Sequence, residues 1–267
     1  MERKFSQVAK LLMGIAVMAS PFAHADEDSY LTLSSGFDYS SGKYGTASVT
    51  DTLSVPISAL YEKGAWSLKL TVPFLMVTGA GDVMVSGRNG GKRRTTTTTT
   101  TTVTKTITTQ TGLGDVVTMA TYNLYSSDES DSGIDLTGRI KFGTASKAFG
   151  SGLNDYSAQM VAYTSVGNLA PSASLGYEVV GSSTTAPMNN VYFGSIGAGY
   201  RLGEQTRIGI DCRYAQKASA TGAEQKDVSL YASQELTPDV YLRGYVLKGF
   251  AAGSADTGLG MSISTTF

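Results

Sequence analysis

The chain has 267 residues, a formal net charge of −1, one cysteine and one histidine. So small a net charge provides no basic field for binding nucleic acid, and a single cysteine, Cys212, excludes a disulfide within the chain. Glycine (31 residues) and tyrosine (15 residues) are frequent, yet few windows are continuously apolar. The chain is therefore best interpreted by the way in which apolar and polar residues alternate.

The first 25 residues have the three-part layout of a secretory leader. Basic residues within the first ten positions precede an apolar core from Leu11 to Ala19, and a small-x-small motif follows at Ala23–Ala25. The apolar core is shorter than the roughly 18 residues of a membrane-spanning helix. We expect residues 1–25 to be a cleaved signal peptide and residues 26–267 to form a single barrel domain.

After the leader, apolar residues alternate with small or polar residues in segments of about ten residues. This period of two is typical of barrel strands that face lipid on one side and water on the other. A soluble β-sandwich shares the alternation, so the pattern alone leaves both folds open. The predicted strands are residues 30–40, 47–61, 65–77, 113–125, 133–143, 155–166, 169–180, 190–202, 205–216, 225–236, 239–249 and 256–267.

These twelve predicted strands are joined by connections of two alternating classes. Mostly tight turns are predicted at residues 62–64, 126–132, 167–168, 203–204 and 237–238, and longer segments at 41–46, 78–112, 144–154, 181–189, 217–224 and 250–255. Short periplasmic turns, longer extracellular loops and an even strand number are typical of bacterial outer-membrane barrels. The sequence thus predicts an all-β fold, a transmembrane antiparallel β-barrel of about 12 strands.

The segment 78–112 is the longest predicted extracellular loop, and it contains eight consecutive threonines, Thr95–Thr102. Threonine favours strands, so residues 84–86 and 103–109 can extend a hairpin above the membrane. A disordered surface loop is an equal alternative. A plug folded into the lumen and a ligand-capturing lid are further hypotheses.

The C-terminal segment favours the barrel over the sandwich. Counting back from Phe267 by twos gives Thr265, Ile263, Met261 and Leu259, while the opposite face carries small or hydroxylated residues. This pattern resembles the C-terminal signal of bacterial outer-membrane barrels. We expect Phe267 to be the membrane assembly signal recognised by the barrel-assembly machinery, and the last strand to pair with the first, which leaves no exposed edge.

The alternation also assigns a face to each side chain. Apolar runs such as Trp66, Leu68 and Leu70 are expected to face lipid, where an Arg or Lys at mid-depth would cost about 2–4 kcal/mol. Tyrosines near strand ends are expected to form interfacial girdles; they are Tyr30, Tyr61, Tyr122, Tyr125, Tyr177, Tyr200 and Tyr241. The predicted lumen-lining residues, expected near mid-depth, are Lys69, Arg139, Glu178, Arg207, Asp211, Arg213 and Arg243, and Asp135 and Lys141 fall on the same face.

Catalytic and metal sites are not expected. The sole histidine, His24, lies in the predicted leader, so the Ser–His and Asp–His arrangements of barrel hydrolases cannot be built in the mature chain. A zinc site would lack histidine and a second cysteine. The glycine-rich segment Gly112–Asp115 precedes no predicted helix and is interpreted as a loop-to-strand turn. We therefore expect no enzymatic activity and no cofactor.

Three sequence features resemble one known family. They are Gly-x-Gly-Asp at 112–115 before a strand that ends in Tyr122-x-Leu124, Lys141-x-Gly-Thr144 at a strand end, and Gly150-Ser-Gly152 leading into Asp155-Tyr156. This part of the chain resembles the outer-membrane transporter-like family associated with the MetA pathway of phenol degradation. Membership implies a passive channel or transporter, in some cases linked to aromatic compounds, and it carries over no substrate-binding residue.

The leading functional hypothesis is a porin-like protein that lets small solutes, aromatic or anionic compounds among them, diffuse through its lumen. Twelve strands lie between filled eight-stranded barrels and open sixteen-stranded ones, which predicts a narrow pore partly closed by side chains or by the long loop. The predicted basic lining residues outnumber the acidic ones, which predicts a weak anion preference.

Two other functions stay open at this point. One is a surface binding protein that uses a closed barrel as scaffold for the 78–112 loop. The other is a carrier of apolar compounds, which requires an apolar lumen and rests on inward-facing Val191 and Phe193. In each case we expect the protein to lie in the outer membrane of a Gram-negative bacterium, in contact with lipid and lipopolysaccharide.

Overall fold

The computed structural model describes residues 29–81, 83–84, 93–94, 106–127, 129–146, 149–184 and 187–267. The predicted leader and Thr95–Thr102 lie outside the described residues. Within the described ranges, no helix has both the length and the apolar character needed to cross a bilayer.

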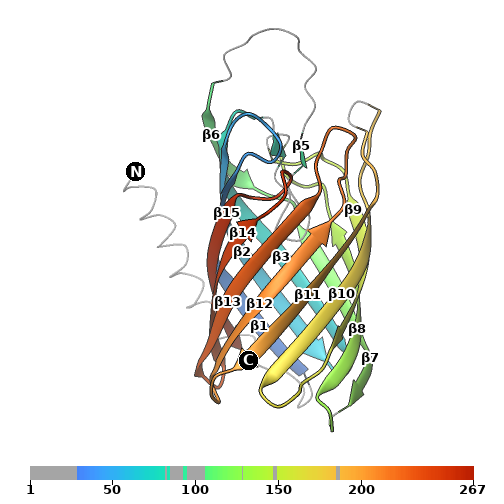
Figure 1. Ribbon diagram of the computed structural model, residues 1–267, viewed down its shortest axis with the longest axis vertical. Helices are drawn as coiled ribbons and strands as arrows, with labels where there is room; N and C mark the ends of the chain where they lie inside the picture. Colours follow the sequence, from blue (N-terminus) through green and yellow to red (C-terminus); the bar gives the residue numbers. More distant parts are fainter. Residues whose placement is uncertain are drawn as a thin grey trace.

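The described residues form one closed antiparallel barrel (Figure 1). Its strands are β1 (Ser29–Gly42), β2 (Thr50–Lys63), β3 (Trp66–Gly79), β6 (Thr108–Leu113), β7 (Val117–Ser127), β8 (Ser132–Lys141), β9 (Asp155–Tyr163), β10 (Leu169–Val179), β11 (Val191–Arg201), β12 (Thr206–Ala215), β13 (Gln225–Thr237), β14 (Val240–Gly249) and β15 (Thr257–Thr266). Each strand pairs with its neighbours in the chain, and the β1–β15 pairing completes the ring. A separate two-stranded ladder joins β4 (Val83–Met84) to β5 (Arg93–Arg94).

β6 and β7 are two parts of a single barrel strand, because both pair with β3. The described part of the chain thus builds twelve barrel strands, which confirms the predicted fold class and strand number. The first and last strands satisfy each other's backbone groups to the very end: the Phe267 amide donates to the Leu31 carbonyl at 2.9 Å, and the Leu31 amide donates to the Phe267 carbonyl at 3.1 Å. A membrane-spanning sheet requires such complete pairing, because the hydrocarbon of the bilayer offers no hydrogen-bond partners to backbone groups.

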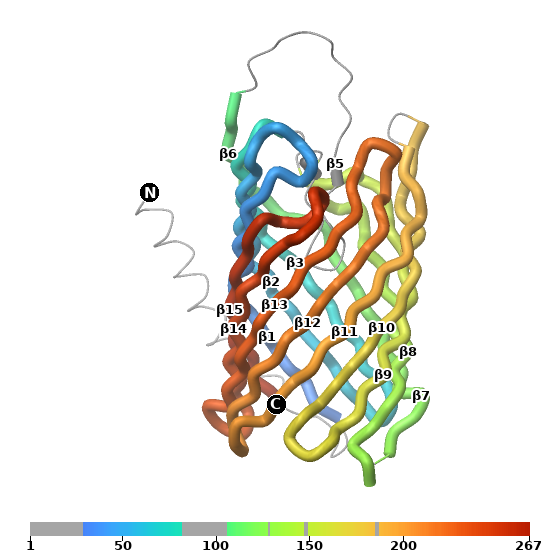
Figure 2. The backbone as a smooth tube through the Cα atoms, viewed as in Figure 1, coloured from blue at the N-terminus to red at the C-terminus, as the bar shows by residue number. Residues whose placement is uncertain are grey.

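The short and the long connections lie at opposite ends of the barrel, as Figure 2 shows. We call these the short-turn end and the long-loop end. Two of the short turns contain a glycine in the left-handed region, Gly64 with φ 57° and Gly167 with φ 61°. Glycine, which has no Cβ, adopts this conformation at no steric cost. The chain can therefore reverse its direction between two strands within a few residues.

The outer face of the barrel is apolar. On β3 the exposed fractions are 60% for Trp66, 55% for Leu68 and 44% for Leu70, so large apolar side chains point away from the protein as the alternation predicted. Aromatic rings pair on this face, Trp66 with Tyr122 at 4.7 Å and Tyr177 with Tyr192 at 4.8 Å between centroids. Such a surface is stable only against lipid.

Two of the predicted girdle tyrosines lie on the other face. Tyr241 is opposite Ser264 and two residues from the cavity residue Arg243, and Tyr30 shares the alternation of Ser34, which also faces the cavity. The expectation of an interfacial girdle is therefore wrong for Tyr30 and Tyr241. The reason is that a position near a strand end does not by itself determine the face.

The barrel strand made of β6 and β7 differs most from its prediction. It starts at Thr108 rather than residue 113, because four polar residues, TTQT, pair with the end of β3 above the apolar part of the strand. It is interrupted at 114–116, where the Gly114 amide donates to the Pro73 carbonyl at 2.8 Å. A Cβ at Gly114 would lie 2.8 Å from the Leu75 side chain, so this close approach requires glycine.

Candidate functional site

The barrel encloses a cavity of about 780 Å³ that is lined by residues from all twelve barrel strands. Serine and threonine make up 15 of the 45 lining residues, and nine others are charged, so the wall is hydrophilic. Hydroxyl groups join neighbouring strands on this face: Ser58 to Thr71 at 2.9 Å, Thr121 to Thr137 at 2.8 Å and Ser174 to Ser195 at 2.9 Å. Such a surface is compatible with water and with polar solutes.

The structure separates the seven predicted lumen residues into two groups. Lys69, Arg139, Asp211, Arg213 and Arg243 line the cavity. Arg207 shares the alternation of Asp211, but it is the second residue of β12 and lies exposed at the short-turn end. Glu178 is the last residue but one of β10, near the long-loop end, and it is 4% exposed. A mid-depth position was therefore wrong for Arg207 and Glu178, and Lys69, the fourth of the 14 residues of β3, also lies nearer the short-turn end. The reason is that alternation determines the face of a residue but not its depth.

Acidic residues of the wall were largely missed. Asp38, Asp115 and Asp227 line the cavity together with Asp211, so four carboxylates face five cations there. Asp38 and Asp227 alternate with serines on strands whose other face is apolar, and this signal was sufficient to find them. The near balance removes the excess of basic residues on which the expected anion preference was based.

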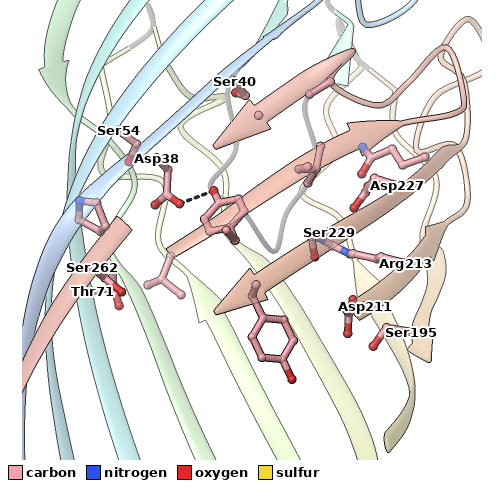
Figure 3. A pocket seen from close by; sticks show the side chains of 18 of the residues that line it. Asp38, Ser40, Ser54, Thr71, Ser195, Asp211, Arg213, Asp227, Ser229 and Ser262 are labelled. Carbon is pink, nitrogen blue, oxygen red and sulfur yellow. Dashed lines mark hydrogen bonds between the residues drawn. The ribbon is translucent and has the colours of Figure 1, made fainter. Parts of the chain in front are cut away.

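On one wall of the lumen, charged side chains make contacts with neighbouring protein groups. Figure 3 shows Asp211, Arg213 and Asp227 on this wall, and Arg213 is directly opposite Asp227 on the next strand. All three make polar or electrostatic contacts. The Arg243 guanidinium lies 4.3 Å from the centre of the Tyr231 ring, a cation–π arrangement.

On the same side of the lumen, the Tyr245 hydroxyl donates to the Asp38 carboxylate at 2.5 Å, the dashed line in Figure 3. This bond connects β14 with β1 across the intervening strand β15.

A buried ion cluster lies at the long-loop end of β8. The Lys141 ammonium is 3.1 Å from Asp115 Oδ2 and 2.8 Å from Asp155 Oδ2, and none of the three side chains is more than 6% exposed. The remaining carboxylate oxygens fix two loops: Asp115 Oδ1 accepts from the Ala145 amide at 2.9 Å, and Asp155 Oδ1 accepts from the Gly181 amide at 2.8 Å. The cluster therefore anchors the loops on both sides of β9.

The described part of the β8–β9 segment, residues 142–146 and 149–154, folds inward at this end. Phe149 is 3% exposed and packs on Leu75, which lines the cavity, with Val77 and Ala145 beside it. The Thr144 hydroxyl accepts from the Val116 amide at 2.9 Å. Phe149 therefore packs on the inner face of the barrel wall at the long-loop end. The sequence predicted a lumen partly closed by side chains or by the 78–112 loop, and most of that loop lies outside the described residues.

The inward fold also explains why the three family-like sequence features occur together. Asp115, Lys141 and Asp155 each belong to one of them, and all three meet in the ion cluster. A Cβ at Gly150 would lie 3.1 Å from Asp115 Oδ1, so the first glycine of the third feature lies in tight contact with this carboxylate. The three features thus meet at one ion cluster.

Two further loops contribute to the mouth. Ser254 and Tyr44 line the cavity and are buried. The Ser254 hydroxyl donates to the Lys226 carbonyl at 2.9 Å and accepts from the Lys226 amide at 2.8 Å, which holds residues 250–256 against β13. Burial raises the pKa of the Tyr44 phenol to about 12.

Comparison with known proteins identifies the fold. Neither a protein-family model nor a curated protein matches the sequence. Among solved structures, an outer-membrane channel from Pseudomonas putida F1 is 12% identical with a TM-score of 0.67, covering 93% of this chain and 98% of that one. The β domain of the Bordetella autotransporter BrkA (12% identity, TM-score 0.54, 90% and 100% coverage) and the NanC porin (12%, 0.50, 88% and 98%) are also similar.

These likenesses extend over nearly the whole described barrel and show a shared fold. That fold, the closed pairing and the apolar outer face agree, and the protein is an outer-membrane β-barrel.

Proposed function

We propose that the protein is a passive outer-membrane channel for small hydrophilic solutes. The observation that carries the proposal is the cavity of about 780 Å³, enclosed by all twelve barrel strands and lined by hydroxyl and charged groups. A barrel that served only as a scaffold would be more stable with its interior packed by apolar side chains, because buried polar groups need partners.

The composition of the wall favours polar over apolar solutes. Phe193 lines the cavity and Val191 is buried, as the carrier hypothesis requires, but nine charged residues share the same wall. An apolar compound would have to displace water from these groups without replacing its hydrogen bonds. A carrier of apolar hydrocarbons is therefore less favoured than a channel for hydrophilic solutes.

Membership of the MetA-pathway family is part of the proposal. It is supported by the three sequence features and by their convergence on one ion cluster. We further propose that residues 1–25 are removed on export and that Phe267 is the assembly signal. Phe267 is 37% exposed at the end of β15, on the alternation of the lipid-facing Ile263, where a recognition factor could reach it before closure.

Single-channel recording tests the channel function. Purified protein, refolded in detergent and added to a planar bilayer, is expected to produce discrete conductance steps, and liposomes that contain it are expected to swell in a small uncharged sugar. Protein that has folded, as judged by its β-rich circular dichroism, but gives neither conductance nor swelling would contradict the proposal.

A further inference from the structure

Lys69 differs from the other charged residues of the cavity wall. Nine charged residues line the cavity. Eight of them make polar or electrostatic contacts with protein groups: Asp38, Asp115, Arg139, Lys141, Asp211, Arg213, Asp227 and Arg243. No residue that the structure describes provides such a contact for Lys69, although its side chain is half-buried.

The immediate neighbours of Lys69 on the inner face are apolar. Leu60 on β2 and Met119 on β7 lie directly opposite it, one on each side. An ammonium group that is partly removed from water and lacks a counter-charge is unfavourable, and its field is focused by the low-dielectric wall. Both effects favour an anion at this place.

Hydroxyl groups complete the site. Thr71 is the next inner-face residue along β3, and its hydroxyl shares a hydrogen bond of 2.9 Å with that of Ser58 on β2. A carboxylate has two oxygens, so one can accept from the Lys69 ammonium while the other accepts from a hydroxyl. A monatomic anion such as chloride has only one acceptor atom to share between the two donors, so this pair of donors favours a carboxylate.

We infer that Lys69, with the Thr71 hydroxyl beside it, holds the carboxylate of small organic anions as they pass through the lumen. This inference rests on the proposed channel function. It adds a binding step at one residue, and such a step has a kinetic signature: conductance saturates when the site is filled.

The test is single-channel conductance at rising concentrations of potassium acetate. The wild-type channel is expected to saturate, Lys69→Met to lose saturation and rise linearly, and Lys69→Arg to retain it. Lys226→Met is the matched control, because Lys226 is exposed, does not line the cavity and pairs with Glu224 at 2.6 Å. This variant should saturate like the wild type. Thr71→Val should shift half-saturation to higher acetate and leave the chloride curve unchanged.

Each outcome decides a separate question. The same concentration dependence in wild type and Lys69→Met, with both folded and conducting, would overturn the inference while leaving the channel intact. Saturation with chloride but not with acetate would overturn the assignment to carboxylates. A folded wild-type protein that does not conduct would refute the proposed function itself.

Discussion

Four glycines of the lumen wall lie directly opposite an inward-facing aromatic residue. The pairs are Gly133 with Tyr163, Gly176 with Phe193, Gly209 with Tyr231, and Gly260 with Tyr245. In each pair a Cβ on the glycine would overlap the ring. The rings therefore lie over the bare backbone of the neighbouring strand, along the wall, instead of projecting into the lumen. This arrangement covers glycine positions in a sheet and keeps the cavity open.

Replacing one of these glycines should affect both stability and conductance. In Gly260→Ala the new methyl group would displace the Tyr245 ring and would lie 2.7 Å from Asp38 Oδ1, so the Tyr245–Asp38 hydrogen bond should be lost. We expect a loss of about 1–3 kcal/mol in the free energy of unfolding and a smaller single-channel conductance. Urea unfolding in detergent and bilayer recording measure the two effects.

Gly138 on β8 provides the matched control. A Cβ there would meet no atom within 4 Å, and its backbone is in the ordinary strand region. Gly138→Ala is expected to be neutral or to stabilise by about 0.4–1 kcal/mol, with unchanged conductance. If Gly260→Ala and Gly138→Ala were equally destabilised, the loss would come from the glycine backbone and not from displacement of the Tyr245 ring.

Tyr44 should make the stability of the barrel depend on pH in the alkaline range. Its pKa is raised from 10.0 to about 12, mainly by burial, which favours the neutral phenol in the folded state. The raised pKa contributes roughly 2–3 kcal/mol to the free energy of unfolding. This contribution is fully present below pH 10 and is lost as the pH rises from 10 to about 12. We expect the difference in unfolding free energy between wild type and Tyr44→Phe to shrink or reverse over this interval. A difference that does not vary with pH would exclude the titration of Tyr44 as the cause.

At the scale of elements, the inward β8–β9 segment depends on one ammonium group. Lys141 compensates two carboxylates that are almost completely buried. In Lys141→Met both would stay buried without their cation, which should destabilise the protein by about 3–5 kcal/mol. Release of residues 142–154 should also widen the mouth and raise the conductance. Unfolding and bilayer measurements on the same sample test both.

Asp155→Asn is the companion variant, because it keeps the shape of the side chain and leaves one carboxylate on Lys141. A smaller loss of stability than in Lys141→Met is expected. If Lys141→Met unfolds at the wild-type urea concentration, the cluster does not anchor the loop.

The sequence predicted those elements whose residue pattern is constrained by contact with the lipid bilayer. The period of two in β3 or β15 follows from the cost of placing a polar group in lipid, so strands, faces and closure could be derived residue by residue. The partners of Lys141 could not, because the contact with Asp155 depends on the register of β8 with β9 and the contact with Asp115 on the break between β6 and β7. The alternation of apolar and polar residues likewise could not predict the depth of Glu178 or the inward position of Phe149.

For the whole molecule, the two ends of the lumen have different chemistry. The long-loop end holds the ion cluster and the inward Phe149, whereas Lys69 lies on β3 only three residues from its short-turn end. A solute that enters from the long-loop side therefore passes Phe149 and the ion cluster first and Lys69, which has no partner among the described residues, later. This order suits a channel in which the mouth selects by size and the inner wall by charge.

The segment between β3 and β6 can be used to test the proposed channel function against a surface-binding scaffold. Its strands pair as far as Gly79 and Thr108, and in Figure 1 β6 stands at the long-loop end of the barrel. Deletion of residues 86–108 should leave the conductance of a channel unchanged if residues 142–154 narrow the mouth, because Phe149 and the ion cluster are retained. A clear increase in conductance would instead assign the narrowing to the long loop. Loss of surface binding by cells that carry the deletion, at unchanged conductance, would favour the scaffold, since the barrel wall has then been left intact.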